Sequence, residues 1–84
     1  MIDKKLQPVE WAAFMCELED AQEHLGNLIK DVERDLGYGE PELRIDLGHV
    51  FAHLNRAWRR SARDLNDAEW DWASKFPDDL TPVG

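Results

Sequence analysis

The sequence predicts an all-α fold: an antiparallel hairpin of two long helices, with a short third helix packed at its open end. Residues 8–36 and 41–65 carry apolar side chains at spacings of three and four residues, which is the pattern of an amphipathic helix. The glycines between the two segments indicate a tight turn. Residues 67–76 predict the third helix. With 84 residues, the chain is expected to form one domain over residues 1–84.

The first helix is expected to begin at Pro8, because proline suits the first helical position. Glu10 places a negative charge where it interacts favourably with the helix dipole. Gly37 is expected to end this helix in the left-handed conformation. The apolar stripe of the helix consists of Trp11, Phe14, Leu18, Ala21, Leu25, Leu28, Val32 and Leu36.

The second helix is expected to begin at Pro41 and the third to follow a capping box formed by Asn66 and Glu69. Pro77 should end the third helix, which leaves residues 77–84 as an extended tail. The stripe of the second helix consists of Leu43, Leu47, Val50, Leu54, Ala57, Ser61 and Leu65.

Residues 11–16 are apolar around the whole helix circumference, so a single neighbouring helix cannot cover them. In an antiparallel hairpin they lie beside the end of the second helix, where the third helix starts. We therefore expect the third helix to fold back and to place Trp70, Trp72 and Phe76 over Trp11, Phe14 and Trp58.

The hairpin also predicts a register. With a hinge near Tyr38, residues at the same level have numbers that sum to about 77. The first helix is acidic and the second half of the second helix is rich in arginine, so ion pairs are expected between them. The expected level pairs are Glu17 with Arg60, Glu33 with Arg44, Glu19 with Arg59, and His24 with His53.

Composition excludes several classes of protein. The formal net charge of −8 argues against a general nucleic-acid or anionic-membrane binder, because both need a cationic face. No apolar run approaches the ~20 residues of a membrane span, and the N-terminus lacks the apolar stretch of a secretory signal. The single cysteine, Cys16, excludes an internal disulfide framework. A cytoplasmic protein is the simplest expectation.

A histidine cluster is one candidate site. His49 and His53 are four residues apart on one helix face, and the register brings His24 beside them, with Glu17 and Asp20 one turn away. Imidazole and carboxylate groups are ligands for zinc or a similar ion. The alternative is that these are half-exposed residues at a helix–helix or subunit boundary.

A second candidate is acidic. Glu19-Asp20-Ala21-Gln22-Glu23, followed by Glu42 and Asp46, resembles the Glu-Glu-x-x-Glu … Glu-x-x-Asp pattern of the MazG-type nucleotide pyrophosphohydrolases. The resemblance implies an all-α, dimeric or tetrameric enzyme whose carboxylates hold Mg²⁺ against the phosphates of a nucleotide. The second half of the pattern departs from the family, because Glu42 and Asp46 are four residues apart rather than three.

The remaining helix faces predict a protein that binds proteins rather than an enzyme. A two-helix core is narrow, so a homodimer that forms a four-helix bundle is expected, with Ala12 and Cys16 of the first helix near the second subunit. The sequence thus predicts a small acidic interaction module with itself and another protein as partners, and without a cofactor. The expected partner-binding residues are Ile45, Ala52, Arg56, Arg63 and Trp72.

Overall fold

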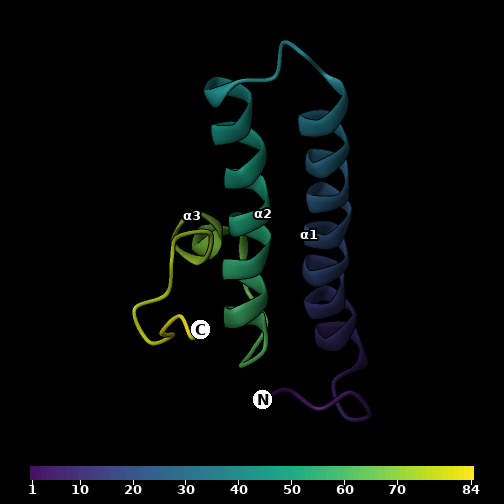
Figure 1. Ribbon diagram of the computed structural model, residues 1–84. Coiled ribbons are helices and arrows are strands. Elements are labelled where there is room, and N and C mark those ends of the chain that lie inside the picture. Colours follow the sequence, from purple (N-terminus) through teal and green to yellow (C-terminus); the bar gives the residue numbers. More distant parts are fainter.

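The computed structural model describes all residues from 1 to 84 and is helical throughout its regular elements (Figure 1). The elements are α1 (Pro8–Arg34), α2 (Glu40–Arg60), the 3₁₀ turn η1 (Asp67–Glu69) and α3 (Trp70–Ala73). The two long helices α1 and α2 pack side by side and run in opposite directions. The predicted all-α hairpin with a short third helix is therefore confirmed.

Helix α1 begins at Pro8, as expected, and ends at Arg34, two residues before the predicted end at residue 36. Gly37 does not adopt the left-handed conformation, because the only positive φ in the chain is at Gly84. A side chain instead stabilises the turn that follows the helix, because the Asp35 carboxylate accepts a hydrogen bond from the Gly37 backbone N–H at 2.8 Å. This prediction of a glycine cap was wrong, and an aspartate turn takes its place.

Helix α2 begins at a capping contact in which the Glu42 carboxylate accepts a hydrogen bond from the Gly39 backbone N–H at 2.9 Å. The helix ends at Arg60, earlier than predicted. The N-terminal segment crosses beneath the open end of the hairpin (Figure 1), where the Ile2 backbone N–H donates to the Ser61 carbonyl at 2.7 Å. Ile2 is buried in this position, so the segment before α1 helps to close the open end.

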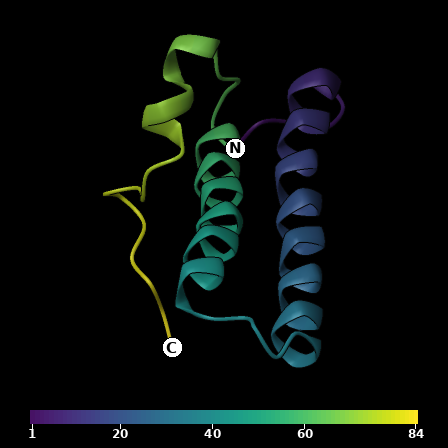
Figure 2. The same ribbon diagram turned by 90° about the horizontal axis from the view of Figure 1, so that it is seen from above.

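The predicted capping box before the third helix is confirmed. The Glu69 backbone N–H donates to the Asn66 side chain and the Asn66 backbone N–H donates to the Glu69 carboxylate, both at 3.1 Å. The helix itself is shorter than the predicted 67–76. It packs on the side of α2 that faces away from α1, as both views show (Figures 1 and 2). The expectation that it covers Trp11 and Phe14 was therefore wrong, whereas Trp58 does lie close to Trp72, since both line one pocket.

The seam between α1 and α2 contains few buried apolar side chains. Ala21 and Leu28 of α1 and Val50 and Ala57 of α2 are the buried ones. The predicted register agrees with two contacts across the seam, Glu17 with Arg60 and His24 with His53. Because only nine of the 84 residues are buried, the hairpin has a narrow core and depends on polar contacts as well.

Candidate functional site

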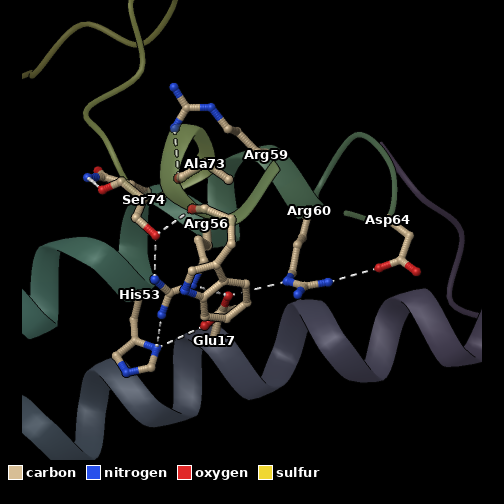
Figure 3. A network of polar contacts seen from close by, with 10 residues as sticks. Glu17, His53, Arg56, Arg59, Arg60, Asp64, Ala73 and Ser74 are labelled. Carbon is tan, nitrogen blue, oxygen red and sulfur yellow. Dashed lines mark hydrogen bonds and ion pairs between the residues drawn. The ribbon is translucent and has the colours of Figure 1, made fainter. Parts of the chain in front are cut away.

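Glu17 is the centre of the polar contacts that join the helices (Figure 3). It lies on α1 beside the seam and is buried, although glutamate is almost never buried unless it is paired. Its carboxylate accepts hydrogen bonds from His53 Nδ1 at 2.8 Å, Arg56 Nε at 2.7 Å and Arg60 Nε at 3.3 Å. All three donors come from one edge of α2, so a single acidic side chain fixes the rotation of α2 against α1. The expected Glu17–Arg60 pair is present.

The Glu17 carboxylate remains ionised in this site. Burial by itself would raise its pKa, because desolvation disfavours the charged form. The hydrogen bonds from Arg56, His53 and Arg60 outweigh burial and lower the pKa of Glu17 below its ordinary value of 4.5. The cluster therefore holds one negative and two permanently positive charges, and Asp64 balances the positive excess by accepting a hydrogen bond from Arg60 Nη1 at 2.8 Å.

Arg56 extends the cluster to the third helix. Its Nη1 donates to Ser74 Oγ at 2.7 Å, and its guanidinium lies over the Trp70 ring, 4.1 Å from the ring centre. The neighbouring Asn55 donates to the Ser74 carbonyl at 2.9 Å. Arg56 therefore bridges α1, α2 and the end of α3, and its guanidinium satisfies a carboxylate, a hydroxyl and an aromatic face together.

A second arginine holds the outer side of α3 in the same way. The Arg59 guanidinium lies over the Trp72 ring, 4.4 Å from the ring centre. Its Nη1 donates to the carbonyls of Ala73 at 2.9 Å and Lys75 at 2.6 Å, which satisfies the free carbonyl groups at the end of a short helix. The expected Glu19–Arg59 pair does not form, because Arg59 points to α3 rather than to α1.

The five predicted partner-binding residues have different surroundings. Arg56 is only 6% exposed, so the prediction that it faces a partner was wrong: α3 covers the face of α2 that carries it. Arg63 is exposed and forms an ion pair with Glu69, and Trp72 is half exposed beneath Arg59. Ala52 is half-buried and Ile45 is 62% exposed.

The histidines do come together. The ring centres of His24 and His53 are 5.0 Å apart in a stacked arrangement, and those of His24 and His49 are 5.4 Å apart. Glu17 contacts His53 through Nδ1, whereas Asp20 is exposed. No group of three or more His, Cys, Asp or Glu side chains is arranged to hold a metal ion. The cluster is a packing contact along the seam, and the zinc hypothesis gains no support from its geometry.

The acidic residues of the nucleotide-hydrolase pattern are dispersed. Glu19, Asp20 and Glu23 are exposed on α1. On α2, Glu42 caps the start of the helix, and Asp46 accepts a hydrogen bond from the Tyr38 hydroxyl at 2.7 Å. The two acidic residues of α2 thus stabilise the hinge, and the Mg²⁺-dependent hydrolase remains an untested prediction.

The Tyr38–Asp46 hydrogen bond predicts a pH response. Desolvation and the hydrogen bond to Asp46 raise the pKa of Tyr38 from 10.0 to about 12. The contribution of this hydrogen bond to stability is complete below pH 10 and is lost as the pH rises through about 12.

Because Tyr38 is the only tyrosine, the absorbance of the phenolate reports the ionisation of Tyr38 alone. We expect Asp46→Asn to move the absorbance midpoint down toward 10. An unchanged midpoint would show that the hydrogen bond does not form in solution.

The opposite edge of the seam is apolar and open. We call this surface the apolar flank. Its side chains on α1 and α2 are more than a third exposed, although all of them except Ile29 belong to the predicted inward stripes. The signal for it was present in the sequence, because these stripes are wider than one seam can cover. The apolar flank consists of Leu18, Leu25, Ile29, Val32, Leu43 and Leu54.

A pocket of about 690 Å³ lies at the open end of the hairpin. Trp58 and Trp72 line it together with Arg63, and Asp79 closes one side by accepting a hydrogen bond from the Trp58 indole N–H at 2.9 Å. The pocket thus combines exposed aromatic rings with charged groups of both signs.

Comparison with known proteins identifies no relative. No protein-family description, no curated protein sequence and no solved structure matches this chain. No helix of the structure has the length and apolar character needed to cross a membrane.

Proposed function

We propose that this protein is a small acidic protein–protein interaction module that works as a homodimer in the cytoplasm. The observation that carries the proposal is an excess of exposed surface. The chain exposes 6420 Å², whereas a folded monomer of 9.8 kDa exposes about 5,200 Å² according to the scaling of surface with mass. A surface excess of this kind, together with only nine buried residues, supports a subunit whose core is completed by a partner.

The buried polar groups support an interaction role over a catalytic one. The charged groups of Glu17, Arg56 and Arg60 form ion pairs with one another. Every buried side-chain nitrogen and oxygen has a hydrogen-bond partner. Their arrangement fits a scaffold that holds three helices in a fixed relation. The exposed free thiol of Cys16 suits a reducing compartment.

The open-end pocket supports a second contact, with another protein. Trp72 and Arg63 are exposed at its rim, and both residue types are enriched where proteins bind each other. In this proposal the dimer is the working unit, and each copy offers its aromatic end to a further protein.

The mass of the protein in solution tests the proposal. We expect light scattering after gel filtration to return twice the 9.8 kDa mass of the chain at micromolar concentration. Dilution should shift the equilibrium toward the monomer, because association depends on concentration. A mass of 9.8 kDa that does not change up to the highest concentration measured would contradict the homodimer.

A further inference from the structure

We infer that the apolar flank is the dimer interface and that its occupant is the same flank of a second copy. This inference rests on the proposed function, because it states which surface joins the two subunits. It also replaces the surface expected from the sequence, around Ile45, Ala52 and Arg56. Arg56 is covered by α3, and Ile45 is separated from the open seam edge by the width of the helix.

The side-chain contacts fix the side on which the flank lies. Glu17 contacts His53 and Arg60, and His24 stacks on His53, so one edge of the seam is polar on both helices. A helix rotates by about 100° per residue, which places Leu25 and Leu54 on the opposite edge of the same seam. The apolar side chains of α1 and α2 thus form one continuous surface rather than two separate stripes.

The six side chains of the flank are uncharged, and the charged groups that line the surface beside Leu43, which are Glu40 and Arg44, form an ion pair with each other. This matters because each copy carries a formal net charge of −8, so two copies repel each other over most of their surfaces. Docking through the outer face of α1 would bring Glu19 and Glu23 of both copies together. The flank is the surface where a second copy meets apolar groups without this repulsion.

The exposed surface of the chain is large enough for a second copy. The excess over an ordinary monomer is roughly 1,200 Å² for the whole chain with its exposed termini, and each partner of a standard interface buries ~800 Å². Two hairpins that meet through the same flank form a four-helix bundle with a twofold axis, the commonest symmetry of homo-oligomers. Leu28 and Val50, which are buried in the two-helix seam, would then lie beside a four-helix core.

Matched isoleucine substitutions test the inference. Ile29→Glu places a charge on the flank, and Ile45→Glu places the same charge on the other side of the hairpin, at similar exposures of 52% and 62%. Light scattering over a concentration series measures the dimer dissociation constant of each. We expect Ile29→Glu to raise the constant by about 100-fold or more and Ile45→Glu to leave it within about threefold. Far-UV circular dichroism reports whether each variant remains helical.

Each outcome decides between the two proposals. A dimeric wild type with a monomeric Ile29→Glu and a dimeric Ile45→Glu supports the inference. A dimeric wild type whose Ile29→Glu variant remains dimeric overturns the inference and leaves the homodimer standing. A monomeric wild type overturns both. If Ile29→Glu loses its helical signal, light scattering is repeated on the neutral variant Ile29→Gln. A monomeric Ile29→Gln supports the inference, and a dimeric Ile29→Gln overturns it.

Discussion

Replacing Glu17 with alanine is expected to destabilise the protein by about 3–5 kcal/mol, because the change leaves buried arginine charges without their carboxylate. Arg56 and Arg60 both lose their partner on α1, and both are mostly buried. Domains of this kind have unfolding free energies of about 5–15 kcal/mol, so the variant should be close to unfolding. Urea denaturation at one fixed protein concentration measures the loss.

A combined variant separates the charge effect from a packing effect. Glu17→Leu with Arg56→Met and Arg60→Leu removes the buried charges together, and apolar replacement of buried ion clusters is often neutral or stabilising. We expect this variant to regain most of the stability lost in Glu17→Ala. Wild-type stability should fall as the pH drops from 4.5 through the lowered pKa of Glu17. A loss below about 1 kcal/mol in Glu17→Ala would show that the cluster does not hold the helices together.

Replacing Leu28 with alanine is expected to cost about 2–3 kcal/mol, near the lower end of the range for buried leucines. Leu28 is the largest of the buried apolar side chains in the seam, opposite Val50. The cost is toward the low end because the seam is narrow and can partly collapse. Chemical denaturation again measures the change at a fixed protein concentration.

Ile45→Ala is the matched control for this substitution. Ile45 is 62% exposed and lies outside both the seam and the apolar flank, so its truncation should cost no more than about 0.5 kcal/mol. If Leu28→Ala and Ile45→Ala were equally mild, the seam between α1 and α2 would not be the core of the protein.

The helical hairpin could be predicted because its signals are local. Spacings of three and four residues define α1 and α2, and the glycines and Pro41 between them define the turn. Two level pairs, Glu17 with Arg60 and His24 with His53, follow from the hinge position alone. The other two expected pairs do not form, because Arg44 pairs with Glu40 of its own helix and Arg59 contacts α3.

The rotation of α2 and the place of α3 could not be predicted, because they depend on contacts between distant residues. Leu43 and Leu54 belong to the expected inward stripe, yet they are 38% and 41% exposed. The apolar stripe of α2 is wider than the seam. The contacts of Glu17 with three side chains of α2 turn the polar edge of α2 toward α1, which leaves part of the stripe exposed. No local pattern shows that Arg56 would be covered by α3.

Contacts between two copies of the chain test the central claim most directly. In an equal mixture of isotope-labelled and unlabelled protein, isotope-filtered nuclear Overhauser spectra detect only contacts between subunits. We expect such contacts at the methyl groups of Leu25, Ile29 and Leu54 and none at Ile45. Contacts between copies at Ile45 alone, or no contacts between copies at any methyl group, would contradict a dimer formed through the apolar flank.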